Sequence, residues 1–166
     1  MGEHLLGLLK VRVLRGANLA FRDVRSSDPF VVLLMGNQKL KTPVIKNCVN
    51  PVWNEQLTLS VEDPTLPVRL EVYDKDTFTL DDPMGNAEFD IQPIIEAGKM
   101  NPEGLPNGTI ITQVVPNRQN CIAKESPIYW SDGEVVQDLV LRLRDVECGE
   151  VELQLEWNSV PGAGGI

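Results

Sequence analysis

Residues 151–157 read VELQLEW and alternate strictly between apolar and polar side chains. Successive side chains of a β-strand point to opposite faces, so such alternation buries one face and leaves the other in water. Residues 10–13 (KVRV), 68–73 (VRLEVY) and 139–143 (LVLRL) repeat the pattern. These four segments are typical of half-buried strands in an antiparallel sheet.

Two further segments are predicted to be strands. Residues 30–35 (FVVLLM) are uniformly apolar, as expected where both faces of a strand are covered, and residues 57–61 (LTLSV) resume the alternation. Turn formers separate the segments: Gly36-Asn37, Asn50-Pro51, Asp63-Pro64, Pro83 with Gly85-Asn86, and Glu147-Cys148-Gly149. Seven or eight short strands with turns between them predict an all-β, antiparallel β-sandwich.

The stretch 93–132 departs from this pattern, since it is rich in Pro, Gly and Asn and contains one short helical segment at 94–98. It is too long for an ordinary loop and too short for a domain, so we interpret it as an insertion. The chain has 166 residues, of which 42% are hydrophobic, as expected for one domain. We therefore predict a single domain over 1–160 and a flexible tail at 161–166.

Composition excludes several classes of protein. The net charge of −9 argues against a general nucleic-acid binder. No apolar run is long enough to cross a bilayer. Three cysteines without a CxxC pair favour reduced thiols in the cytoplasm or nucleus. Neither a G-x-x-x-x-G-K-[ST] loop nor a G-x-S-x-G elbow is present, so an enzyme is not expected.

Aspartates concentrate in two segments that each lie between predicted strands. Residues 22–30 read RDVRSSDPF and residues 74–83 read DKDTFTLDDP. Their carboxylates would repel one another if the loops met without a cation between them. Calcium takes six to eight oxygen ligands in tolerant geometry, whereas the twelve-residue spacing of an EF-hand is absent. The alternative is that these aspartates only form turns and solubilise strand ends.

Four motifs in order resemble the signatures of the C2 domain: residues 27–31 (SDPFV), 50–55 (NPVWNE), 72–76 (VYDKD) and 84–85 (MG). The resemblance implies an eight-stranded sandwich with loops at one end that hold calcium, expected as two ions. The side-chain ligands that it implies are Asp23, Asp28, Asp74, Asp76 and Asp82, with backbone carbonyls of Arg22 and Lys75 and a possible contribution from Asp81. Because residues 149–156 look like the strand that opens many C2 domains, it also implies the permuted type II topology, with first and last strands adjacent.

Residues 115–121 (VPNRQNC) and 141–150 (LRLRDVECGE) resemble marks of a narrower group, the plant C2-domain abscisic-acid-related proteins. This resemblance implies calcium-dependent phospholipid binding and recruitment of abscisic-acid receptors to the plasma membrane. It also implies a peripheral membrane, cytoplasmic and nuclear location. A member of the group is described as an activator of an unconventional GTPase/ATPase, which is our alternative function, with Arg22, Arg25 or Arg118 as a possible arginine finger.

Membrane contact is expected at two places. Val24, Phe78 and Leu80 lie near the loop tips and are predicted to dip into the interface once calcium neutralises the loops. Lys39, Lys41 and Lys46 are predicted to form a basic groove for lipid, although Pro43 stands where relatives have another basic residue. The alternative for these lysines is a solvated strand face. Partner recognition is placed on the insertion, whose alternative is an ordered flap covering the sandwich.

Overall fold

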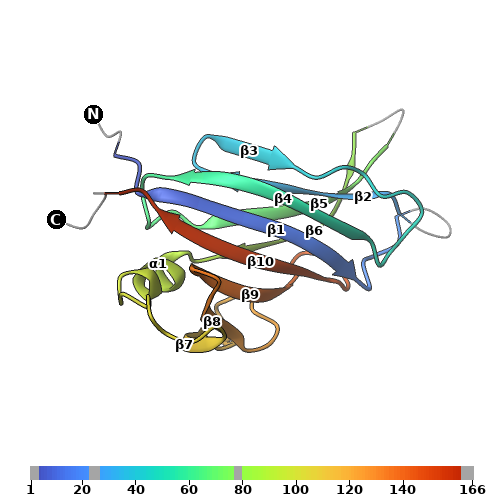
Figure 1. Ribbon diagram of the computed structural model, residues 1–166. Helices are drawn as coiled ribbons and strands as arrows, with labels where there is room; N and C mark the ends of the chain where they lie inside the picture. The colour runs from blue at the N-terminus through green and yellow to red at the C-terminus, as the bar shows by residue number, and fades with distance from the viewer. Residues whose placement is uncertain (1–3, 23–26, 77–79, 162–166) are drawn as a thin grey trace.

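The computed structural model describes residues 4–22, 27–76 and 80–161 as two antiparallel sheets packed face to face (Figure 1). Its elements are β1 (Gly7–Ala17), β2 (Pro29–Met35), β3 (Gln38–Lys41), β4 (Val52–Val61), β5 (Val68–Asp74), β6 (Asp82–Phe89), α1 (Gln92–Gly98), β7 (Thr109–Val114), β8 (Ser126–Ser131), β9 (Glu134–Arg142) and β10 (Glu150–Ser159). One sheet has the order β4-β1-β10-β9-β8-β7 and the other the order β3-β2-β5-β6.

The predicted eight-stranded sandwich is confirmed, and the insertion adds to it. Eight strands lie outside residues 93–132, whereas β7 and β8 lie within them and extend the larger sheet beyond β9. The first and last strands are neighbours, because β1 pairs with β10 along almost its whole length. This is the permuted topology that the C-terminal motif implied.

Alternation in the sequence becomes alternation in burial. In β10, Val151, Leu153, Leu155 and Trp157 are buried while the residues between them are more exposed. In β2 both faces are covered, and Phe30 on its outer face stacks on Tyr73 of β5 with ring centroids 5.8 Å apart. No helix in the described part of the chain has the length and apolar character that a bilayer crossing requires.

The insertion is a folded part of the sandwich. The expected short helix is present as α1, and its Ile94, Ile95 and Ala97 are buried in the common core. Trp130 of β8 is also buried there, whereas Tyr129 faces the other side of the sheet and its hydroxyl donates to Asp138. Partial burial, together with this hydrogen bond, raises the pKa of Tyr129 to about 12.

The prediction of a turn at Pro83 and Gly85-Asn86 is wrong, because these residues belong to β6. β6 is an edge strand, where a proline without an N–H is tolerated. The register between β5 and β6 shifts between Glu71 and Tyr73. This β-bulge accommodates Gly85, whose φ is +108°. The far edge of β6 is held by Arg144, which exchanges two backbone hydrogen bonds with Asn86.

Replacing Gly85 by Ala is expected to lower the free energy of unfolding by about 2–4 kcal/mol. A Cβ at Gly85 would lie 2.6 Å from Val146 Cγ1 and 3.0 Å from Leu143 Cβ, in addition to the strain of a positive φ. Gly104→Ala is the matched control, since Gly104 also has a positive φ but no described atom lies within 4 Å of an added Cβ. Urea unfolding measures both variants, and equal losses would contradict the steric explanation.

Candidate metal centre

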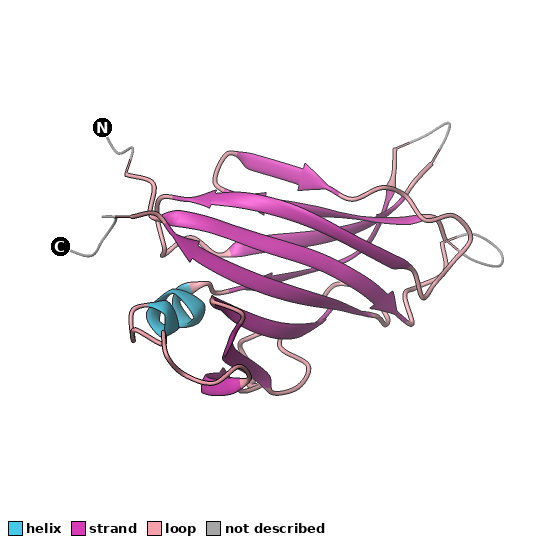
Figure 2. Cartoon of the chain, viewed as in Figure 1, coloured by secondary structure: helices cyan, strands magenta, loops and turns pink. Residues whose placement is uncertain are grey.

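Sheet register brings the acidic residues of two distant segments to one end of the sandwich. Pro29 at the start of β2 pairs with Asp74 at the end of β5, and Asp74 pairs with Asp82 at the start of β6. Asp28 precedes Pro29 directly, so three predicted ligand residues lie at adjacent strand ends. Figure 2 shows these ends on the side of the sandwich away from α1. We call this end, formed by residues 19–28 and 74–82 where described, the metal pole.

Backbone hydrogen bonds hold these carboxylates in place. Asp74 is 4% exposed, and its Oδ1 accepts the N–H of Asp28 at 2.7 Å. The N–H of Lys75 returns to the carbonyl of Asp28 at 2.9 Å. Asp28 in turn accepts the N–H of Asn47 through Oδ1 at 2.7 Å. These contacts cross-link the two acidic segments, and they leave Asp28 Oδ2 without a hydrogen bond among the described residues.

The second acidic segment turns back on itself. Asp81 Oδ1 accepts the N–H of Asp76 at 2.8 Å, and its Oδ2 lies 3.8 Å from Lys75 Nζ. More than half of the Lys75 side chain is in solvent, so this ion pair contributes little stability. Asp81 therefore serves first as a turn-forming acceptor. Its role as a metal ligand stays a prediction.

The donor set suits calcium in its chemistry. Carboxylate oxygens and backbone carbonyls are hard ligands of the kind that calcium takes at about 2.3–2.6 Å. Within residues 4–22, 27–76 and 80–161, no three His, Cys, Asp or Glu side chains converge closely enough to form a metal-holding group. Asp23 lies outside the described residues, as do Val24 and Phe78. The ligand set thus stays a prediction, and the described part of it lies at one pole.

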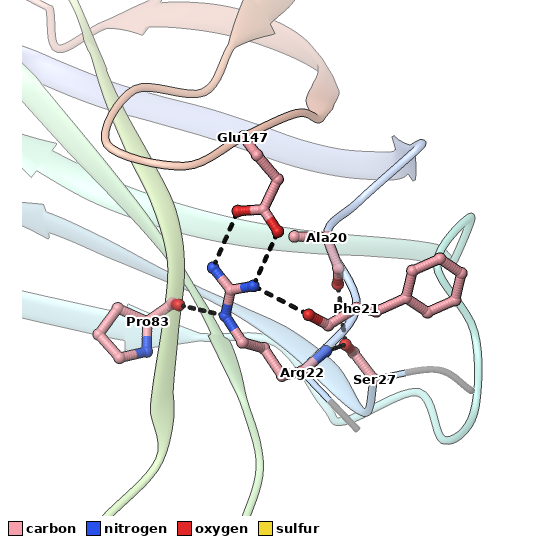
Figure 3. Close-up of polar contacts among 6 residues, drawn as sticks. All are labelled: Ala20, Phe21, Arg22, Ser27, Pro83 and Glu147. Atoms are coloured by element: carbon pink, nitrogen blue, oxygen red, sulfur yellow. Dashed lines mark hydrogen bonds and ion pairs between the residues drawn. The ribbon is translucent and has the colours of Figure 1, made fainter. Parts of the chain in front are cut away.

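The Arg22 side chain is held at this pole by several hydrogen bonds, and we call this arrangement the Arg22 clamp (Figure 3). Its guanidinium donates to the carbonyl of Pro83 at 3.1 Å, to the carbonyl of Phe21 at 2.9 Å, and to both oxygens of Glu147 at 3.1 and 3.4 Å. The backbone N–H of Arg22 donates to the Ser27 hydroxyl at 2.8 Å. One side chain thereby ties the first acidic segment to β6 and to the β9–β10 connection.

The contact of Arg22 with Glu147 is an ion pair, and Glu147 is titratable. The hydrogen bond from Arg22 lowers the pKa of Glu147 below its ordinary value of 4.5, even though the carboxylate is exposed. Ser27, which is fully buried, completes the arrangement by donating to the carbonyl of Ala20 at 2.8 Å. The clamp fixes where the first acidic segment leaves the sheet.

The predicted basic groove is mixed in charge. Lys39 and Lys41 are exposed on β3 and pair with Leu34 and Val32 of β2. The next strand on the same face carries Arg69 and Glu71, which form a 3.0 Å ion pair. Lys46 lies in the connection after β3, not on a strand as expected, and is exposed. The lysines thus line an edge of the sheet rather than the middle of a uniformly basic face.

Two apolar side chains of the metal pole are exposed to solvent. Leu80 is 90% exposed and Phe21 is 56% exposed. Leu80 is one of the three residues predicted to enter the membrane, whereas Phe21 was not identified from the sequence. An apolar side chain exposed to this extent, beside a cluster of carboxylates, suits a surface that is buried only when it meets a partner or an interface.

Sequence reasoning also missed Ser27 and Glu147 as supports of the pole. Both act through contacts between segments far apart in the chain, so no local pattern marks them. Glu147 was quoted only as part of a turn and of a family motif. One feature could have identified Glu147: it lies in the connection that leads to β10. Because β10 pairs with β1, and β1 precedes Arg22, this connection lies near Arg22.

Comparisons with known proteins agree with the fold. The C2 domain family model matches residues 7–106. "GTPase activating protein 1" of Oryza sativa subsp. japonica is 66% identical over 163 residues, covering 98% of each chain. "Protein C2-DOMAIN ABA-RELATED 4" of Arabidopsis thaliana is 62% identical over 164 residues, covering 99% of this chain and 93% of the relative.

Solved structures show the same fold at lower identity. A single C2 domain of plant Extended Synaptotagmin 1 has a TM-score of 0.62 and 23% identity, covering 94% of this chain and 97% of that domain. A calcium-bound pair of C2 domains from Extended-Synaptotagmin 2 matches with a TM-score of 0.64 and 23% identity, covering 93% of this chain and 46% of theirs.

The sandwich and its acidic pole therefore define a C2 domain. More narrowly, the chain belongs to the plant C2-domain abscisic-acid-related family, whose members it matches along nearly its full length.

Glu147→Gln is expected to lower stability near neutral pH and to lose this effect in acid. Because the pKa of Glu147 is lower in the folded state than in the unfolded chain, the ion pair stabilises the fold above the unfolded-state value and its contribution disappears as the pH falls through the folded value. Urea midpoints at about pH 7 and about pH 3 measure this. Glu62→Gln, a change at the other end of the sandwich, is the control. A stability difference that persists unchanged in acid would contradict the clamp.

Proposed function

We propose that this protein is a calcium-dependent, phospholipid-binding adaptor that brings abscisic-acid receptors to the plasma membrane and that also occurs in the cytoplasm and nucleus. The observation that carries the proposal is the register of β2, β5 and β6, which brings the strand ends that carry Asp28, Asp74 and Asp82 to one end of the sandwich, where Leu80 is exposed. The names of the relatives link them to abscisic acid, which supports a role in abscisic-acid signalling. The protein acts in this role by binding rather than by catalysis.

Charge explains why calcium acts as the switch. Without metal, the five predicted carboxylate ligands carry the same sign of charge as an anionic leaflet and are repelled by it. Each basic residue near the membrane surface contributes only about 1 kcal/mol of attraction, which does not overcome this repulsion. Two calcium ions nearly neutralise those carboxylates. Ligand positions that the protein leaves open are then available to phosphate oxygens of the lipid headgroup. The exposed Leu80 gains apolar contact on the same side, together with Val24 and Phe78 in the proposal.

Lys39, Lys41 and Lys46 supply a second, weaker contact with anionic headgroups. Their solvent exposure supports this part of the proposal, because a screened surface charge acts only over about 8–10 Å. The ion pair of Arg69 with Glu71 on β5, two strands from β3 on the same face, limits the positive potential there. The lysines therefore add affinity after the metal pole has docked, and they do not replace it.

The insertion provides the surface for the protein partner. Of the eight large apolar side chains that are exposed in the described part of the chain, four belong to it: Met100, Leu105, Ile110 and Val115. Exposed apolar side chains gathered on one segment favour an interaction surface. The metal pole lies at the other end of the sandwich from α1, so a partner on the insertion and a membrane at the pole need not compete (Figure 1).

Asp28→Asn is expected to reduce calcium-dependent binding to anionic vesicles about tenfold or more, which is at least ~1.4 kcal/mol. The asparagine carbonyl still accepts the N–H of Asn47, so the change removes charge while keeping the local hydrogen bond. Asp63→Asn is the matched control, since Asp63 forms a turn with Thr65 between β4 and β5, at the opposite end.

Sedimentation with phosphatidylserine vesicles, in calcium and in chelator, measures this prediction. The wild-type protein and Asp63→Asn should sediment with the vesicles only in calcium. Equal sedimentation in chelator would rule out the switch, and an unaltered Asp28→Asn would remove this residue from the ligand set.

A second candidate function is activation of an unconventional GTPase/ATPase, favoured by one observation on the insertion. Arg118 is exposed and makes no hydrogen bond or ion pair with any described residue. Its loop is fixed by Asn117, whose Oδ1 accepts the N–H groups of Gln119 and Asn120. An arginine finger acts by placing its guanidinium against the transferring phosphate of another protein, and an exposed arginine is able to do this. Arg22 is engaged by the clamp, and Arg25 lies outside the described residues.

Single-turnover nucleotide hydrolysis by such a GTPase tests this function. Arg118→Ala should lower the stimulated rate about a thousandfold, because the finger stabilises charge on the transferring phosphate. Arg118→Lys should recover little, since an ammonium does not match the planar guanidinium. Arg69→Ala controls for loss of a surface arginine. Full stimulation by Arg118→Ala would exclude Arg118 as the finger.

A further inference from the structure

Trp157 closes the core at the end of the sandwich opposite the metal pole. It is the last buried residue of β10, which ends on the same side of the sandwich as α1 (Figure 1). Trp157 is 6% exposed, so most of its ring is covered. A tryptophan that is buried to this extent usually has an acceptor for its indole N–H.

The indole N–H of Trp157 donates to no residue in the described part of the chain. Among the described residues, Gln137 Oε1 is the one polar side-chain atom that both lacks a partner and is completely covered. Since Trp157 Nε1 lacks a partner as well, it must keep some surface that another molecule can reach. An acceptor from outside the described fold is therefore needed to satisfy this donor.

Glycines flank the indole at two of its edges. A Cβ at Gly98 of α1 would lie 3.1 Å from Cδ1 and 3.5 Å from Nε1 of Trp157. A Cβ at Gly7 would lie 2.7 Å from Cη2, on the opposite side of the ring. The edge that carries the N–H thus faces Gly98, where the lack of a side chain leaves space beside the donor.

Trp157 and Gly98 line a cavity of about 500 Å³ between α1 and the sandwich. Its apolar wall is completed by Leu6, Pro64 and Ile95, which come from three different parts of the chain. A cavity of this volume, with apolar walls and a few polar groups, is typical of sites that hold small organic ligands.

The apolar wall is fixed without a ligand. The N–H of Leu6 donates to the carbonyl of Val61 at 2.8 Å, and the carbonyl of Leu6 accepts the N–H of Val160 at 2.9 Å. Ile95 is 6% exposed and belongs to the common core. Little ordering of the protein is therefore required when a molecule binds in this cavity.

The rim of the cavity carries no net charge. Glu96 and Lys99 are the charged side chains among the described residues that line it. Lys99 Nζ lies 3.6 Å from Glu96 Oε2, and more than half of each side chain is in solvent. A charged ligand would lose hydration in the cavity without gaining an unpaired opposite charge, so an uncharged ligand is favoured.

We propose that this cavity binds a small uncharged organic molecule with an apolar body, whose carbonyl or similar oxygen accepts the indole N–H of Trp157. The site contains none of the predicted calcium ligands and lies at the other end of the sandwich from them. Its occupancy requires neither calcium nor lipid, so it is tested separately from the membrane switch.

Titration of the ¹⁵N-labelled protein with camphor, in the presence of a calcium chelator, tests the proposal by chemical shift. Saturable shifts of the Trp157 indole N–H and of the Gly98 amide are expected. Because camphor has no aromatic ring, a downfield shift of the indole proton reports the hydrogen bond to its carbonyl. Absence of saturable shifts would overturn the proposal.

Camphorsulfonate provides the charged counterpart, since it has the same apolar body with an added anionic group. It should bind at least about tenfold more weakly than camphor, because the anion loses hydration at a rim whose cation is already paired. An affinity equal to that of camphor, or higher, would contradict the assignment of an uncharged ligand.

Trp157→Phe removes the donor and keeps an aromatic ring. Its affinity for camphor should fall about fivefold, as expected for the loss of one hydrogen bond between neutral groups. Trp130→Phe is the matched control, because it makes the same change at another buried tryptophan, one that does not line this cavity. An equal loss of affinity in the control would contradict the role of Trp157.

Gly98→Ala tests the site without altering the indole. Gly98 does not have a positive φ, and alanine favours a helix more than glycine does, so the melting temperature should change little. The added Cβ narrows the space beside Nε1, and the affinity for camphor should fall about fivefold or more. Unaltered affinity in both folded variants, Trp157→Phe and Gly98→Ala, would exclude Trp157 Nε1 as the donor.

Discussion

Antiparallel pairing of β2, β5 and β6 is the constraint on which the rest of the site depends. The pairing aligns Pro29, Asp74 and Asp82 across three strands, although these residues lie far apart in the chain. Neighbouring strands are about 4.8 Å apart, so these three strand ends lie at the same end of the sandwich. Hydrogen bonds that join Asp74 to Asp28 and Asp28 to Asn47 hold these strand ends to one another and to the connection after β3. The acidic pole is a consequence of sheet register rather than of loop conformation alone.

The pole is braced from outside by contacts that do not depend on a bound metal. The Arg22 side chain bonds to Pro83 and to Glu147, so the first acidic segment is tied to β6 and to the connection before β10. β10 in turn pairs with β1, which leads back to that same segment. Because the brace is an ion pair in water, its strength depends on its geometry and on pH rather than on burial. The permuted topology makes this arrangement possible, because it places β10 beside β1.

Much of the fold was predictable because its signal is local. The alternating residues 151–157 and 68–73 correctly identified β10 and β5. The uniformly apolar residues 30–35 correctly identified β2. β6 was missed because Pro83 and Gly85 suggest a turn unless the edge position and the bulge are known. β7 and β8 were missed because their apolar residues gain burial only when the strands extend an existing sheet. At the site, residue types indicated calcium, whereas Ser27 and Glu147 act through long-range contacts that no motif reveals.

The central claim is that calcium and anionic lipid bind cooperatively at the metal pole. Calorimetric titration of the protein with calcium, with and without phosphatidylserine vesicles, tests this most directly, because linkage requires lipid to strengthen calcium binding by the factor by which calcium strengthens lipid binding. The account predicts measurable calcium binding to the free protein that becomes at least about tenfold tighter with vesicles, equivalent to ~1.4 kcal/mol of coupling. An absence of calcium binding in both titrations, or an affinity that vesicles do not change, would contradict it.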